Sequence, residues 1–426
     1  MKEHFFIKES LADKITFYHL LAFAISLPFD RLYSELALIS ITIHTLIHVK
    51  KETLRSIKWP AVLLPCSIYL LTVIGTAYTR FYDEAFFEWE RQLAMILFPL
   101  IVVCNGFDFR RYRFQVVFAL ACSCSLTILY LYYTAFGIID YNHMPATAIF
   151  SNAFINHRFS APIDMHATYF SMYILLGTMS TIYGWIHTTE SKYRWLYGLM
   201  FLILLAGLIQ LSSRAVLIAF AIILFGVLPF AINDRRKRAG FLVLSVLGAV
   251  ITFYGITRMD DLKNRMTTGL RDEITESGIN ENQEEPRIKR WESAWPMIKE
   301  SPLYGHGSGS EVALLKEIYF KDKLYNSYLH DLNIHNQYLS MLIKTGIPGL
   351  LILLYIFFSG IRYAFRKRDL LLTSFMIIIC SVSFSENIMD ANKGIFYFSF
   401  FFALLWLAPQ KEKPDLLEDE IVTISA

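Results

Sequence analysis

Long apolar runs separated by short polar turns are the feature that most limits what this chain can fold into. A helix that crosses a lipid bilayer needs about 20 mostly apolar residues, and by that measure the sequence offers about twelve candidate spans. They lie at residues 15–29, 32–48, 59–78, 92–107, 115–136, 166–187, 194–212, 215–232, 240–256, 337–361, 370–386 and 393–408. A hydrophobic fraction of 55% and a mean hydropathy of +0.41 are too high for an ordinary soluble protein. The sequence therefore predicts an all-α integral membrane protein with about twelve transmembrane helices.

Basic residues follow every second span. They are Lys50, Lys51, Arg55, Lys58, Arg110, Arg111, Arg113, Lys192, Arg194, Arg235, Arg236, Lys237, Arg238, Arg362, Arg366, Lys367 and Arg368. Short loops rich in Lys and Arg stay in the cytoplasm, so this alternation favours an even number of spans. We therefore expect a multi-pass protein with both termini in the cytoplasm. The charged N-terminal segment lacks a small-residue cleavage site and is expected to be retained.

One long polar stretch interrupts the apolar pattern and divides the chain. We expect nine spans within residues 1–256, a loop with amphipathic helices on the non-cytoplasmic side over residues 257–336, three spans within residues 337–408 and a cytoplasmic tail over residues 409–426. The first part of the loop, residues 263–286, is polar and contains glycine. This composition predicts a mobile segment whose acidic residues form a solvated face.

Helical signals return in the second part of the loop. Pro286 suits the first position of a helix, and the apolar residues that follow recur at helical spacing, at Ile288, Trp291, Trp295 and Ile298. A second amphipathic helix is expected near residues 311–328.

The tenth span contains Gly346, Pro348 and Gly349. Either one tilted helix bends at these residues, or a short interfacial helix ends there before the true span begins. We favour one bent helix, because neighbouring helices can satisfy the backbone groups that proline and glycine leave free.

Three arginines are candidates for binding an anion. Arg214 lies between two apolar spans with no room for a long loop, where a cation is costly unless it is paired, faces water or extends to the interface. Arg287 and Arg290 are three residues apart on a predicted helix, where they can share a binding face or a merely solvated one. Planar guanidinium groups bind phosphate oxygens in pairs. Converging at the membrane edge, these arginines would suit a pyrophosphate carried by a lipid.

His335 is the candidate general base, because an unperturbed imidazole titrates near neutral pH. A histidine at the start of a helix is otherwise commonly structural. Asn336 lies beside it as a supporting residue. His166 opens the sixth span on the same side of the membrane and is a second candidate, and Arg91 is a further candidate for the phosphate-binding group.

Three more charged residues lie in or beside the last spans. Glu386 and Asp390 follow the eleventh span, where they can orient a cation or a histidine, or form a structural ion pair. Lys344 is expected to extend to the interface or to pair with an acid.

The sequence lacks the signatures of several other chemistries. It contains no P-loop, no GxGxxG motif after a strand, no serine nucleophile elbow, no HExxH motif and no Asp-x-Asp signature. The five cysteines all lie in apolar runs without metal-ligand spacing, and the net charge is only +3. We therefore expect no metal, no cofactor and no nucleic-acid partner.

Several motifs together resemble one family. The stretch R-x-x-x-W-x-x-A-W-x-M-I-K-E-S-P-L-x-G-x-G begins at Arg287 and ends at Gly307. It is followed by H-N-Q-Y-L from His335 and by G-I-P-G-L from Gly346. With the S-S-R-A run at Arg214 and the late acidic pattern at Glu386, these residues resemble the O-antigen ligase and polymerase superfamily of bacterial envelope enzymes.

The resemblance implies a glycosyltransferase of the GT-C type that works without a metal at the periplasmic face of the bacterial inner membrane. Such an enzyme moves a glycan from undecaprenyl pyrophosphate to an acceptor, which in O-antigen ligases is a sugar hydroxyl of lipid A–core. By motif, Arg214 and Arg287 would bind the pyrophosphate and His335 would be the base, with Gly305 and Gly307 in support. Arg290 is a local addition, and Arg91 matches the family only loosely.

Other functions remain open at this level. A polymerase or a protein O-oligosaccharyltransferase of the same superfamily would use the same residues with a different acceptor. A polysaccharide lipid transporter belongs to another class, and transporters commonly place their charges at the bilayer midplane within repeated halves. Here the charges gather at one face and no internal repeat is visible, which favours the enzyme.

Overall fold

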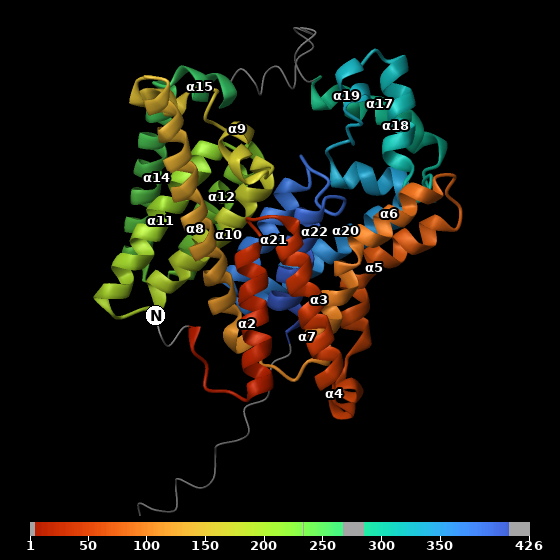
Figure 1. Ribbon diagram of the computed structural model, residues 1–426, viewed down its shortest axis with the longest axis horizontal. Coiled ribbons are helices and arrows are strands. Elements are labelled where there is room, and N and C mark those ends of the chain that lie inside the picture. Colours follow the sequence, from red (N-terminus) through yellow and green to blue (C-terminus); the bar gives the residue numbers. More distant parts are fainter. Residues whose placement is uncertain (1–4, 233, 267–284, 409–426) are drawn as a thin grey trace, which may run out of the picture.

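The computed structural model describes residues 5–232, 234–266 and 285–408, and over these residues the chain is helical without strands (Figure 1). Part of the predicted mobile segment (267–284) and the predicted tail (409–426) lie outside the described residues. The main helices are α2 (Leu11–Ser26), α3 (Arg31–His48), α4 (Lys51–Ser56), α5 (Trp59–Thr76), α6 (Tyr82–Gln92), α7 (Ala94–Cys104), α8 (Phe109–Tyr141), α10 (Ala167–His187), α11 (Ser191–Leu211), α12 (Arg214–Gly226), α13 (Leu228–Ala231), α14 (Arg235–Thr257), α15 (Asp260–Met266), α17 (Arg287–Glu300), α18 (Ser310–Lys321), α19 (Tyr325–Leu329), α20 (Gln337–Lys367), α21 (Leu370–Val382) and α22 (Asn392–Phe402). Short helical turns are η1 (Ala146–Phe150), α9 (His157–Ser160), η2 (Ala161–Ile163) and η3 (Ala403–Leu407).

The long apolar helices confirm an all-α membrane protein. Within the described residues, 6 helical stretches are long and apolar enough to cross a bilayer. They are α5, α8, α11, α12 continued by α13, α14 and α20. Each of the other predicted spans is also helical, but those helices are shorter or less apolar. Length and composition therefore support several crossings without establishing the expected number.

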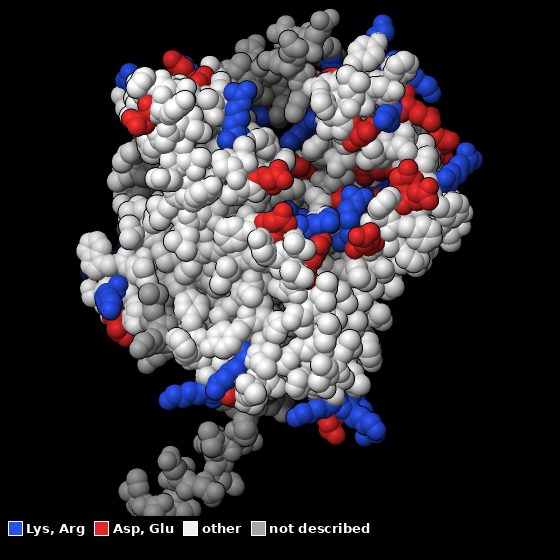
Figure 2. Space-filling view, viewed as in Figure 1, with Lys and Arg blue, Asp and Glu red and all other residues white. Residues whose placement is uncertain are grey.

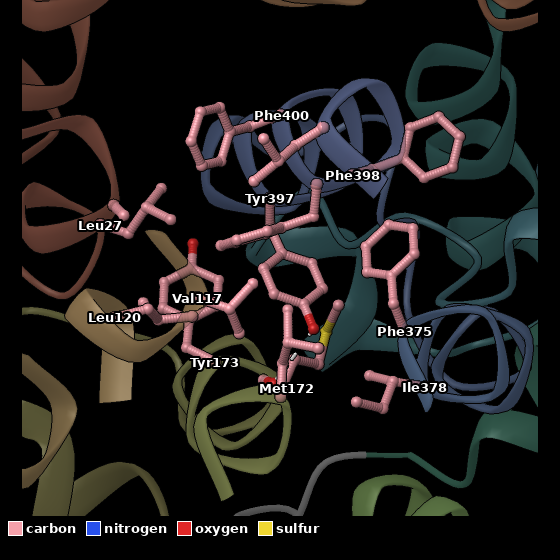
Figure 3. Close-up of a cluster of buried hydrophobic side chains, with 14 of the residues drawn as sticks. Leu27, Val117, Leu120, Met172, Tyr173, Phe375, Ile378, Tyr397, Phe398 and Phe400 are labelled. Carbon is pink, nitrogen blue, oxygen red and sulfur yellow. Dashed lines mark hydrogen bonds between the residues drawn. The ribbon is translucent and has the colours of Figure 1, made fainter. Parts of the chain in front are cut away.

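An aromatic core fixes the last helices in the middle of the bundle (Figure 3). Every residue of α22 from Gly394 to Phe402 is buried, as expected for a helix that is apolar on all sides. The Tyr173 hydroxyl donates to the Lys393 carbonyl at 2.8 Å, and the Tyr397 hydroxyl donates to the Met172 carbonyl at 3.2 Å. These bonds satisfy the polar ends of rings that are otherwise packed among apolar side chains.

The two ends of the bundle differ in charge and in structure. At one end Arg111 pairs with Glu9 at 2.8 Å, and Arg113 pairs with Asp369. These pairs bring the N-terminal segment, the start of α8 and the α20–α21 turn together. At the other end α17, α18 and α19 form a small domain (Figure 1). Its core consists of Ala294, Met297, Ile298, Leu315, Tyr319, Leu324, Ile334 and Ile343.

The small domain is hydrogen-bonded to the bundle at a break in α20. The expected bend lies at Gly346, whose φ of 67° and ψ of −162° are not helical, so two helical segments meet there at a kink. Pro348 has no N–H to bond the Lys344 carbonyl. The Ile343 and Lys344 carbonyls instead accept the N–H groups of His306 at 2.8 Å and Gly307 at 2.9 Å. The Ile347 N–H donates to the Pro302 carbonyl at 2.9 Å, which completes the exchange.

Gly346→Ala should destabilise the protein by roughly 2 kcal/mol or more, because it combines a strained backbone with a clash. An added Cβ would meet the backbone carbonyl carbon and oxygen of Leu303 at 2.5 Å. Thermal unfolding in detergent measures the effect. Gly198→Ala in α11 is the control, since nothing lies within 4 Å of its Cβ. Equal unfolding temperatures for the two variants would contradict this account of the break.

Candidate active site

The polar residues that precede α20 meet the turn between α21 and α22 at the edge of the small domain. Figure 2 shows charged side chains of both signs gathering below α17 to α19, above a broad uncharged area. His335 has φ 49°, and its N–H donates to Asn333 Oδ1 at 3.0 Å. Asn336 is the N-cap of α20, and its side chain accepts from the N–H groups of Tyr338 and Leu339. The His-Asn pair is therefore a helix start that presents an imidazole.

One carboxylate holds both a histidine and an arginine. Glu386 Oε2 lies 3.2 Å from His335 Nδ1, and Glu386 Oε1 accepts from Arg287 Nη2 at 3.2 Å. The Glu386 side chain is 4% exposed, whereas those of His335 and Arg287 are 20% and 30% exposed. Solvent or a substrate can therefore reach the two nitrogen-bearing groups but not the carboxylate between them.

The charge of Glu386 is well stabilised despite its burial. Burial alone would raise its pKa, but the hydrogen bond to His335 and the charges of His166, His335 and Arg287 lower the pKa to about 2. An ionised carboxylate at Nδ1 favours the histidine tautomer with hydrogen on that nitrogen. Nε2 of His335 is then left as the proton acceptor.

A second group of charges adjoins the first. Lys344 is 6% exposed and pairs with Asp390 at 2.6 Å and with Glu88 at 3.3 Å, so of the two expected outcomes the structure shows pairing. Arg91 Nη1 donates to the Asp390 carbonyl at 3.2 Å. Arg91 thus lies against the same inter-helix turn that carries Glu386.

His166 and Arg214 begin two helices at this end of the bundle. His166 caps α10, its Nδ1 accepting the Thr168 N–H at 3.3 Å, and in its protonated form it would lower the pKa of Glu386. Arg214 is the first residue of α12. Ser213, directly before it, lies 3.4 Å from the Thr168 hydroxyl. The start of α12 therefore packs beside the start of α10, on the same side as Glu386.

The two neighbouring arginines of α17 point to different places. Arg287 reaches Glu386, whereas Arg290 is 2% exposed and lies inside the small domain. Burial raises the pKa of the Tyr319 hydroxyl, and the charge of Arg290 opposes this rise. The structure therefore brings Arg287, and not Arg290, to the group around His335. Gly305 and Gly307 lie in the turn that bonds to the α20 carbonyls.

Several buried carboxylates were not expected from the sequence. The stretch between the predicted spans 59–78 and 92–107 contains most of α6, which places Glu88 beside Lys344. Glu285 was assigned to a solvated face, but it is buried and accepts the N–H groups of Asn326 and Ser327 at 2.7 and 2.9 Å. It therefore caps α19. Glu311 is also buried and accepts the Ile334 N–H at 3.0 Å. Hydrophobic periodicity carries no signal for polar residues that face inward.

These features define a class: a multi-pass, all-α membrane protein with a charged site where a small helical domain meets one end of the bundle. Residues 199–354 match the family described as O-Antigen ligase, and this match confirms the resemblance to the O-antigen ligase and polymerase superfamily. The matched stretch contains Arg214, Arg287 and His335, whereas Glu386 lies beyond it. The protein is also similar to an "Uncharacterized protein" of Haemophilus influenzae (strain ATCC 51907 / DSM 11121 / KW20 / Rd). The two are 22% identical over 330 residues, which cover 73% of this chain and 77% of that relative.

Glu386→Gln should change how stability depends on pH. The folded-state pKa of about 2 lies below the ordinary 4.5, so ionised Glu386 stabilises the fold above about pH 4.5, and this contribution is lost as the pH falls toward 2. Glutamine cannot titrate, so the variant should be less stable at neutral pH, by on the order of 3 kcal/mol, and should lose less on acidification. Unfolding temperatures measured from neutral to acid pH test this. The control is Glu35→Gln, which removes an exposed partner of Arg31. Parallel curves for wild type and Glu386→Gln would contradict the assignment.

Proposed function

We propose that this protein is a glycosyltransferase that moves a glycan from undecaprenyl pyrophosphate to a sugar hydroxyl of lipid A–core, as the O-antigen ligases do. The observation that carries the proposal is the pairing of His335 and Arg287 on the two oxygens of buried Glu386. It occurs in a sequence that matches the O-antigen ligase family over residues 199–354. The base and the anion-binding group of the reaction would thus be held by one carboxylate.

In the proposed reaction His335 accepts the proton of the acceptor hydroxyl at Nε2. The hydroxyl oxygen attacks the anomeric carbon of the glycan, and the bond from that carbon to the pyrophosphate oxygen breaks. The electron pair leaves with undecaprenyl pyrophosphate. Ionised Glu386 stabilises the imidazolium that forms, as a buried carboxylate does for other catalytic histidines. Attack opposite the leaving group would invert the anomeric centre.

Arginines would stabilise the charge on the leaving pyrophosphate. Arg287 is 30% exposed, so its guanidinium has a face available beside Glu386. Arg214 and Arg91 come to this end of the bundle from α12 and α6. Pyrophosphate leaves readily once its developing charge is met by fixed cations, so the protein mainly has to orient the acceptor. Arg290 has no place in this proposal because it is 2% exposed.

We further propose a bacterial inner-membrane protein with twelve spans, both termini in the cytoplasm and residues 257–336 in the periplasm. Its GT-C-type bundle would consist of spans within residues 1–256 and 337–408, followed by the cytoplasmic tail. In support, Arg111, Arg113 and the N-terminal segment lie at the end of the bundle opposite to His335. Basic residues favour the cytoplasmic side. Membrane lipids would surround the bundle.

A null strain complemented with variants tests the function. Cells without the protein should carry lipid A–core without O-chains and should accumulate polymer on the lipid carrier. Wild type should restore the O-chains, and His335→Ala should not, although it inserts in the membrane normally. His330→Ala is the control, because His330 is an exposed histidine of the same segment. Single repeat units on the core of the null strain would indicate a polymerase instead. Full restoration of the O-chains by His335→Ala would show that His335 is not the base.

Arg287→Lys should lower transfer by at least about tenfold, because lysine keeps the charge but cannot bind two oxygens in a fixed plane. The rate of glycan transfer in proteoliposomes measures this. Arg31→Lys is the matched control, since Arg31 is an exposed arginine that pairs with Glu35 at 2.7 Å. Transfer at the wild-type rate by Arg287→Lys would mean that this arginine is a surface cation and not a pyrophosphate ligand.

A further inference from the structure

The backbone on both sides of His335 is held by one buried acid and one amide. Glu311 Oε1 accepts the Ile334 N–H at 3.0 Å and the Asn387 Nδ2–H at 2.9 Å. Asn387 Oδ1 in turn accepts the Asn336 N–H at 2.8 Å. Glu311 is 4% exposed and Asn387 is 2% exposed, so water does not replace these bonds. The position of the imidazole therefore depends on Glu311.

Glu311 Oε2 and an oxygen of Asp390 share one serine hydroxyl as their hydrogen-bond partner. Ser340 Oγ is within hydrogen-bond distance of both Glu311 Oε2 and Asp390 Oδ2, the latter at 3.1 Å. A hydroxyl carries a single hydrogen, which can serve only one of these oxygens. With both acids ionised, the other contact would place two buried acceptors against each other, which is costly.

The neighbours of the two acids decide which one carries the proton. Asp390 Oδ1 receives the Lys344 ammonium at 2.6 Å, and Asp390 Oδ2 receives the Asn387 amide at 3.1 Å. These donors favour an ionised Asp390. Glu311 Oε2 instead faces the Ser340 hydroxyl, and burial raises the pKa of Glu311 more than the charge of Lys344 lowers it.

The direct ion pairs of this group agree with this assignment. Lys344 pairs with Asp390 and Glu88, and His335 and Arg287 pair with Glu386. Glu311 instead bonds to the Ser340 hydroxyl, the Ile334 N–H and the Asn387 amide. In the small domain the charges of Arg290 and Glu311 both act on the Tyr319 hydroxyl.

We propose that Glu311 is held as a neutral carboxylic acid that donates to Ser340 Oγ, that Ser340 donates to Asp390, and that Glu311 in this form is a positioning residue for His335. The positioning part rests on the proposed function, because it takes His335 to be the base. The protonation part stands on the hydrogen bonds alone. Loss of the proton would set two carboxylates against each other across Ser340 and would disturb the turn that carries His335.

The Glu311→Gln variant tests whether Glu311 acts as a neutral acid or as an ionised carboxylate. Glutamine copies the neutral acid, because its oxygen accepts from Ile334 and Asn387 while its NH₂ donates to Ser340. We expect Glu311→Gln to transfer glycan within about twofold of wild type. We also expect the wild-type rate to fall at alkaline pH as Glu311 ionises, and the Glu311→Gln rate to lack this fall. Glu311→Ala should lower kcat about a hundredfold with KM little changed, since the imidazole is misplaced. An inactive but folded Glu311→Gln, or a fully active Glu311→Ala, would overturn the positioning role.

Infrared spectroscopy tests the proton itself without any activity. At neutral pH the wild type should show the carbonyl band of a buried protonated carboxylic acid, and Glu311→Gln should lack it. Glu88→Gln is the matched control, because Glu88 is the other buried glutamate beside Lys344, and it should keep the band. Loss of the band in Glu88→Gln alone, or its absence from wild type, would overturn the protonation of Glu311. A band assigned to Glu311 in a protein that transfers no glycan would refute the proposed function and leave the protonation intact.

Discussion

The exchange of backbone hydrogen bonds at the break in α20 is the interaction on which the site depends. In a regular helix the carbonyls accept N–H groups of the same helix. Pro348 and the non-helical Gly346 leave the Ile343 and Lys344 carbonyls without these intrahelical bonds. At the edge of a membrane protein such groups need partners, and the turn at residues 305–307 supplies them. This docking fixes the small domain on the bundle. The start of α17 can then reach Glu386, and α18 can bring Glu311 to the segment before α20.

Two groups of charges result from this docking, and they differ in access. The group around Glu386 includes side chains that are 20% and 30% exposed, which suits exchange of protons and anions with a substrate. In the group around Lys344, the side chains of Lys344, Glu88 and Glu311 are buried and bond mainly to neighbouring side chains and to the backbone. Asn387 links them, since it follows Glu386 in the sequence and bonds Glu311 and Asp390. The buried group therefore serves to hold the geometry of the exposed one.

The sequence predicted the parts of the fold that follow from composition and spacing. Apolar runs predicted an all-helical membrane protein, and that class is confirmed. His335, Arg287 and Glu386 were singled out as charged groups beside apolar spans, and they lie together. Their roles stay predictions. Glu88 and Glu311 escaped notice because an inward-facing acid in an amphipathic helix looks like a solvated one until its partners are known. The spacing of Arg287 and Arg290 did not show which of them faces the bundle, because positions three apart on a helix can share one face.

His335 and Glu386 belong to the bundle, whereas Arg287 belongs to the small domain. Gln337 ties the start of α20 to the inter-helix turn, since its N–H donates to the Ser383 carbonyl at 2.9 Å and its Oε1 accepts the Met389 N–H at 2.8 Å. The Tyr169 hydroxyl adds a bond to the Asn387 carbonyl from α10. His335 and Glu386 are thus set by helices whose aromatic core is closely packed, so their separation varies little. Arg287 comes instead from a helix bonded to the bundle through a few turns. The imidazole and its carboxylate are therefore fixed by the packing of the bundle, whereas the position of the Arg287 guanidinium depends on how the small domain docks against α20.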